Sequence, residues 1–179
     1  MDKRTLYDPC LMFEHGCAFA DCARLCETEP NNIKYRMHSH TVAGIVNSAF
    51  ACEIFLKALL LSQGCPKAIL RCEEDKGKDK RKGHDLSYLW EKFQEVDIET
   101  TLNIEQRMKL WFNSKNENMF EEMLLDVSNA FEHWRYIYEN DSAKINLNFL
   151  IGLRNILQDT CCREVHGKSW TEYIENSME

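Results

Sequence analysis

Charged side chains set among apolar neighbours are the first candidates for chemistry in this sequence. Glu53 and Lys57 interrupt the apolar stretch "NSAFACEIFLKALLLSQG" of residues 47–64. Because they are four residues apart, they lie on one face of a helix. Two interpretations remain open. The pair is either exposed, where such pairs add about 0.3–0.5 kcal/mol to helix stability, or part of a buried polar network between helices.

His84, Arg135, Glu139 and Arg154 complete the set of candidate ligand-binding residues. His84 lies in "GHDLSYLW", and Arg135 and Glu139 lie in "FEHWRYIYE". An imidazole can exchange a proton near neutral pH. A guanidinium either binds a phosphate or forms a structural ion pair, for which Glu53 and Glu139 are the partners expected for Arg135. The sequence leaves both roles of Arg135 open.

The elements that must hold these residues are predicted to be helices. The 179 residues are 44% hydrophobic and 28% charged, with only seven Gly and three Pro. This composition favours one helical domain over many short strands. Apolar spacing and capping residues predict a single all-α domain over residues 1–179, an up-and-down bundle of five or six helices. Its helices are expected at 7–27, 40–63, 86–96, within 98–115, 118–139 and 147–166.

Charge and cysteine content limit the partners and the cellular location. The net charge of −7 provides no general attraction for nucleic acid, although residues 72–84 contain a local basic run. That run is expected to be a mobile loop, which is either a solvated tether or a means of attracting an anionic partner. Nine cysteines without a secretory signal predict free thiols in the cytoplasm. No complete zinc ligand set, cofactor motif or membrane span of roughly 20 apolar residues is expected.

Three segments in this order carry a family resemblance. They are "ACEIFLKALLL", "GHDLSYLW" and "FEHWRYIYE", and together they resemble the HEPN (higher eukaryotes and prokaryotes nucleotide-binding) family over residues 40–165. The resemblance implies an up-and-down bundle, usually dimeric, with a cleft between its central helices. Many members are metal-independent ribonucleases that act as toxins or anti-phage effectors. Others are non-catalytic, and bind nucleotides or pair with a nucleotidyltransferase.

The catalytic members carry an Arg and a His separated by four to six residues, and this spacing is absent here. The positions permitted after Arg154 hold Asp159, Thr160 and Cys161. Those permitted after Arg135 hold Asn140, Asp141 and Ser142. The resemblance therefore implies a non-catalytic module that binds a nucleotide, RNA or a protein partner in a stress, anti-phage or toxin–antitoxin system. The alternative is a divergent metal-independent ribonuclease, in which Arg135 or Arg154 acts with a displaced histidine such as His84 or His133.

Two arrangements in space are also expected. Glu53, Lys57 and Arg135 should share an interhelical cleft, with His84 nearby. The segment "LWFNSKNENMF" contains more apolar surface than a turn needs, namely Leu110, Trp111, Phe112 and Phe120. Because large exposed apolar patches usually mark interfaces, the segment predicts a homodimer.

Overall fold

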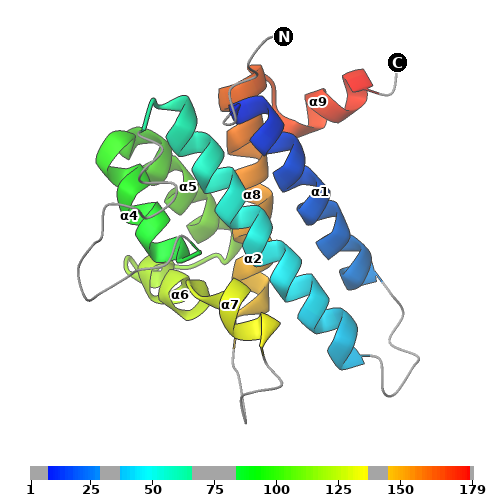
Figure 1. Ribbon diagram of the computed structural model, residues 1–179. Helices are drawn as coiled ribbons and strands as arrows, with labels where there is room; N and C mark the ends of the chain where they lie inside the picture. Colours follow the sequence, from blue (N-terminus) through cyan, green and yellow to red (C-terminus); the bar gives the residue numbers. More distant parts are fainter. Residues whose placement is uncertain (1–7, 29–36, 66–83, 137–144, 178–179) are drawn as a thin grey trace, which may run out of the picture.

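The computed structural model describes residues 8–28, 37–65, 84–136 and 145–177, and these residues form α-helices and turns without a strand (Figure 1). The prediction of an all-α fold is therefore confirmed. Glu139 and the basic run up to Gly83 lie outside the described residues. The helices are α1 (Pro9–Thr28), α2 (Met37–Ser62), α4 (Leu86–Val96), α5 (Ile98–Trp111), α6 (Met119–Val127), α7 (Ala130–Arg135), α8 (Leu147–His166) and α9 (Trp170–Ser177).

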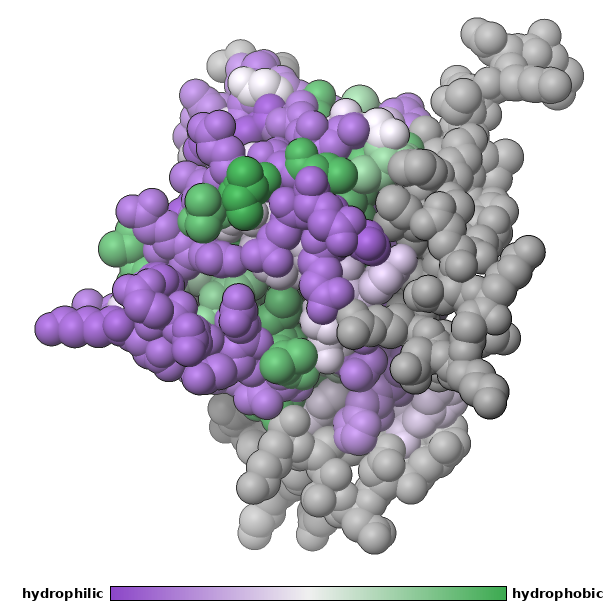
Figure 2. Space-filling model, turned by 90° about the vertical axis from the view of Figure 1, so that its left-hand side faces the viewer, coloured by the Kyte–Doolittle hydropathy of each residue, from purple (hydrophilic) through white to green (hydrophobic). Residues whose placement is uncertain are grey.

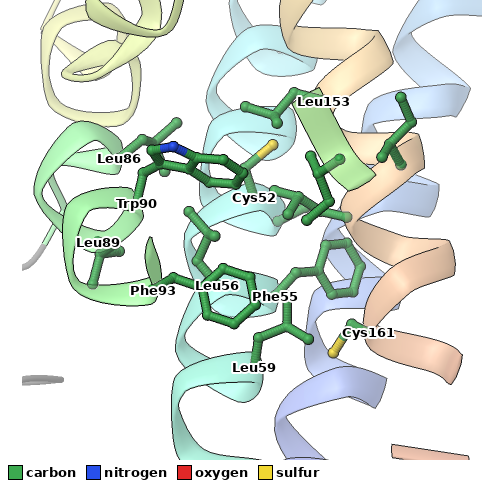
Figure 3. Close-up of a cluster of buried hydrophobic side chains, with 14 of the residues drawn as sticks. Cys52, Phe55, Leu56, Leu59, Leu86, Leu89, Trp90, Phe93, Leu153 and Cys161 are labelled. Carbon is green, nitrogen blue, oxygen red and sulfur yellow. The ribbon is translucent and has the colours of Figure 1, made fainter. Parts of the chain in front are cut away.

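Helix α2 is the centre of the fold. It packs against α1, α4, α7 and α8, and its ribbon crosses the middle of the molecule (Figure 1). The core formed with α4 and α8 holds large apolar side chains from all three helices (Figure 3). Phe55, Leu56, Phe93 and Leu153 in this core are completely buried. Any polar group on this part of α2 must therefore find its partners within the protein.

The segment His40–Ser62 of α2 is long and apolar enough, by length and composition alone, to cross a membrane. The expectation that no segment of the chain could meet this test was therefore wrong. In this structure 67% of the most apolar window of that segment is buried by the surrounding helices. Its hydropathy is accounted for by its place at the centre of the bundle.

The predicted helix at 118–139 is interrupted after Val127, so α6 and α7 are separate helices. Ser128 causes the break through two hydrogen bonds. Its hydroxyl donates to the carbonyl of Leu125 at 3.0 Å. Its own carbonyl accepts the N–H of Leu86 at 3.0 Å, and is thereby diverted to the start of α4. A serine that bonds locally competes with helix propagation in this way.

The described helices are more numerous than the five or six predicted, partly because of this break and partly because of α9. Ser169 and Glu172 form a capping box at the start of α9, in which the backbone N–H of Ser169 donates to the Glu172 carboxylate at 2.8 Å. Trp170 and Tyr173 of α9 make ring contacts with Phe13 of α1. The three-residue spacing of Ser169 and Glu172 in "SWTE" was the missed sequence signal.

The apolar segment around residue 112 is only partly exposed. Leu110 and Trp111 are 74% and 54% exposed, as expected for interface candidates. Phe120 is 1% exposed and its ring contacts those of Trp90 and Phe149 inside the bundle, so its assignment to a surface patch was wrong. Hydrophobic residues are also visible among hydrophilic ones on the face formed by α4, α5 and α6 (Figure 2).

Candidate functional site

Glu53 is a buried carboxylate on the central helix, with a side chain that is 3% exposed. Lys57, one turn further along α2, donates from Nζ to Glu53 Oε1 at 2.6 Å. Nδ1 of His84 lies 2.8 Å from Glu53 Oε2. Each carboxylate oxygen therefore has a partner, as a buried charge requires. Of the two interpretations of the charged pair, the structure supports the buried network.

His84 is held in place by the start of α4. Asp85 is the N-cap of this helix, as predicted, and accepts from the backbone N–H groups of Ser87 and Tyr88 at 2.9 and 3.2 Å. The N–H of Leu86, two residues after His84, donates to the Ser128 carbonyl, and this bond also fixes the start of α4. His84 is 40% exposed, so one edge of its ring reaches the surface while the other faces Glu53.

The Glu53 contact also determines what the imidazole can do. An ionised carboxylate only accepts hydrogen bonds, so Nδ1 must donate to it. In the neutral ring, Nε2 is then the acceptor. Among the described residues, none makes a hydrogen bond with Nε2. A histidine oriented in this way by a carboxylate can accept a proton from a ligand or, once charged, bind an anion.

Phe131 joins His84 to Arg135. Its ring centre is 4.9 Å from that of His84, and the guanidinium carbon of Arg135 lies 5.0 Å from the same ring centre. Arg135 also lies 4.6 Å from the ring of Tyr136 and donates to its hydroxyl at 2.8 Å. The imidazole and the exposed guanidinium therefore contact one aromatic ring.

The predicted ion pair between Glu53 and Arg135 is not formed. Lys57 and His84 occupy the two oxygens of Glu53, and Arg135 is exposed on α7 with its hydrogen bond to Tyr136. The chain nevertheless brings four of the candidate residues close together, because Phe131 bridges the two groups. We call Glu53, Lys57, His84, Phe131 and Arg135 the His84 cluster.

Arg154 belongs to a different network, at the junction of α1, α2 and α8. Its side chain is 1% exposed and donates to Glu27 at 2.6 Å and to the Ser48 hydroxyl at 2.9 Å. Asn155 accepts from Arg154 at 3.2 Å and from Arg24 at 3.3 Å. The contacts of this network and those of the His84 cluster have no residue in common.

Asp159, which occupies one of the three positions where the catalytic spacing permits histidine, has a structural role. It accepts from Arg107 at 2.8 Å, from Arg163 at 3.1 Å and from the backbone N–H of Trp170 at 2.9 Å. Burial by itself would raise the pKa of this carboxyl group, but these donors outweigh it and lower the pKa below its ordinary value. Asp159 thereby connects α5, α8 and α9.

The buried thiols have the properties of packing residues. Burial raises the pKa of Cys17 and of Cys52 to about 12 and that of Cys162 to about 11, so these groups remain protonated at neutral pH. Among the described residues, no group of three or more His, Cys, Asp or Glu side chains is arranged to hold a metal ion.

Phe131 is the member of the His84 cluster that sequence reasoning missed. A signal was present, since Phe131 precedes Arg135 by four residues and such residues contact each other on a helix. Comparisons with known proteins yielded no matching family model, curated protein or solved structure.

Proposed function

We propose that the His84 cluster binds the phosphate of a nucleotide or of RNA, and that the protein is a non-catalytic HEPN-like module. The observation that carries this proposal is the position of His84 and Arg135 against one ring, Phe131. Lys57 offsets the negative charge of Glu53 at 2.6 Å. Arg135 and a protonated His84 therefore remain to attract an anion.

The aromatic rings beside Arg135 favour a nucleotide over a bare phosphate. Phe50 already stacks on Phe131, at 4.7 Å and an interplanar angle of 23°, so Tyr136 is the ring on which a base would stack. Tyr136 is 40% exposed beside the same guanidinium. A base that stacks on such a ring contributes roughly 1–3 kcal/mol. In the sequence, five cations lie within residues 76–82, immediately before His84, and would favour approach of a polyanion.

Binding of a fluorescent single-stranded oligoribonucleotide and of a nucleoside triphosphate, measured by anisotropy, tests the proposal. Losing a charge-assisted hydrogen bond costs roughly 1.5–3 kcal/mol, so Arg135→Ala should weaken binding by about tenfold or more. His84→Ala should weaken it as well. Arg163→Ala is the matched control, because it removes an exposed arginine on α8. Equal losses in Arg135→Ala and Arg163→Ala would show non-specific attraction and contradict the site.

A second function, metal-independent RNA cleavage, is favoured by one specific observation. Glu53 holds Nδ1 of His84, so Nε2 can act as a base, and Arg135 contacts the same Phe131 ring as His84 does. His84 would take the proton of a 2′-hydroxyl, and O2′ would attack the adjacent phosphorus. The P–O5′ bond would then break, with the departing oxygen protonated by solvent. The products would be a 2′,3′-cyclic phosphate and a 5′-hydroxyl, and Arg135 would offset the charge that develops on the phosphate.

RNA incubated with the protein in a chelator distinguishes the two functions. Cleavage that depends on both His84 and Arg135, and that stops when the 2′-hydroxyl is replaced by hydrogen, would establish the ribonuclease. Binding with intact RNA would support the non-catalytic module. The wider setting, a cytoplasmic stress, anti-phage or toxin–antitoxin system with a nucleotidyltransferase partner, is proposed from the family resemblance alone.

A further inference from the structure

The Arg154 network contains a buried cation whose anionic partner comes from the end of another helix. Arg154 on α8 is 1% exposed, and both of its terminal nitrogens donate to the Glu27 carboxylate, at 2.6 and 3.3 Å. Glu27 lies in the last turn of α1 and its side chain is 28% exposed. The carboxylate therefore stands between the buried guanidinium and solvent.

The groups around that carboxylate are the ones that bind oxyanions. The Ser48 hydroxyl, on α2, receives a hydrogen bond from Arg154 at 2.9 Å and can in turn donate to an anion. A second guanidinium, that of Arg24, reaches the same Asn155 oxygen as Arg154 does, at 3.3 Å. Arg24 and Arg154 thus share the Asn155 oxygen, and the Ser48 hydroxyl lies beside the Arg154 guanidinium. Only Glu27 among the described residues supplies Arg154 with a negative charge there.

Arg24 is less firmly committed than Arg154. It pairs with Asp21, which is 64% exposed, and its own side chain is 33% exposed. It also donates to Gln158, a fully buried residue of α8. The Asp21 pair is in contact with solvent and can be lost at small cost, whereas the bond to buried Gln158 keeps the Arg24 guanidinium beside Asn155.

We propose that Arg154, Arg24 and Ser48 form an oxyanion site that Glu27 fills in this structure. A phosphate-bearing ligand would compete with Glu27 for Arg154 and would release the last turn of α1. Glu27 would thus act as an internal mimic of the ligand. This site is separate from the His84 cluster and does not depend on the function proposed for it.

The test removes the Glu27 carboxylate by mutation and supplies a small anion in its place. Glu27→Ala leaves Arg154 without its counter-ion, so phosphate, sulfate or acetate should raise the melting temperature of this variant more than chloride does at equal ionic strength. The apparent affinity for phosphate should be at least about tenfold higher than in the unmodified protein. Asp21→Ala is the matched control. It removes a carboxylate from the same helix, and its response to phosphate should equal that of the unmodified protein.

Two further variants keep the test decisive. Glu27→Gln retains the shape of the side chain without its charge, and is used if Glu27→Ala does not fold. It should also gain a response to phosphate. Combining either change with Arg154→Met removes the cation and should abolish the response. If all variants respond equally to phosphate, if the response persists without Arg154, or if phosphate does not stabilise the unmodified protein, the contact between Glu27 and Arg154 is a structural ion pair and the proposed site is wrong.

Discussion

Among single residues, the burial of Glu53 has the largest energetic consequence. Removing one member of a buried ion pair costs about 3–5 kcal/mol, whereas an exposed pair is worth at most about 1 kcal/mol. Glu53 is buried, while Arg135 is exposed. Glu53→Ala should therefore lower the free energy of unfolding by about 3 kcal/mol, since the solvent contact of His84 reduces the loss. Arg135→Ala should lower it by at most about 1 kcal/mol. Urea unfolding measures both, and equal losses would contradict this assignment.

Asp159 should make stability depend on pH in the acid range. Its pKa is lowered in the folded protein from an ordinary value of 3.8. A lowered carboxyl pKa contributes stability that is present above the unfolded value and is lost as the pH falls through the folded value. The difference in free energy of unfolding between the unmodified protein and Asp159→Asn should therefore shrink as the pH falls below 3.8. Asp126→Asn, which changes an exposed carboxylate, should show no comparable trend. A constant difference for Asp159 would exclude this role.

At the scale of helices, α1 packs tightly against α2 at Gly16. A Cβ atom added there would lie 2.5 Å from the ring of Phe55, which is completely buried. Overpacking of this kind typically costs about 1–3 kcal/mol. Gly16→Ala should lose stability within this range. Gly44→Ala is the comparison, because its added atom would meet Cys26 at 3.3 Å and needs less adjustment. The melting temperature of Gly16→Ala should fall further than that of Gly44→Ala. A smaller fall for Gly16→Ala would contradict this expectation.

Sequence patterns predicted the helices best where the apolar spacing and the capping residues indicated the same helix ends. The helix at 147–166 was predicted with its observed bounds, and Gly167 ends it in the left-handed conformation, at φ 68°. The helix at 86–96 was likewise predicted from Asp85 and its apolar face. The break at Ser128 depends on a hydrogen bond with residue 86, far away in the sequence. Local periodicity does not contain that information.

The candidate site was predicted only in part, for the same reason. The shared face of Glu53 and Lys57 follows from helical spacing, and the nearness of His84 followed from the family resemblance. Glu53 as a partner of Arg135 was wrong, and Glu139, the other expected partner, lies outside the described residues. An exposed aromatic neighbour stabilises a cation about as well as an exposed ion pair does. Which of the two forms depends on how α7 is oriented after the break at Ser128.

At the scale of the whole molecule, the homodimer remains a prediction. The exposed apolar residues of α5 provide a way to test it. Ile98 and Leu102 are each 57% exposed on the same helix as Leu110 and Trp111. If a second copy covers these residues, light scattering should give twice the chain mass of 21.1 kDa. Leu110→Glu should then give the monomer mass. Leu125→Glu, which changes a 66% exposed leucine on α6, should leave the dimer intact. A monomer at every concentration would end the prediction.

The cysteines differ in burial, so the rates at which they are chemically labelled can report transient opening of the bundle. Cys10 and Cys22 are exposed, whereas Cys52 and Cys161 are completely buried. A thiol reagent should therefore modify Cys10 and Cys22 immediately, and should modify Cys52 and Cys161 only when the bundle opens. The ratio of the labelling rate of Cys52 to that of an unfolded thiol gives the free energy of opening at the centre of α2. If Cys161 is labelled faster than Cys52, α8 separates from the bundle before α2 is exposed.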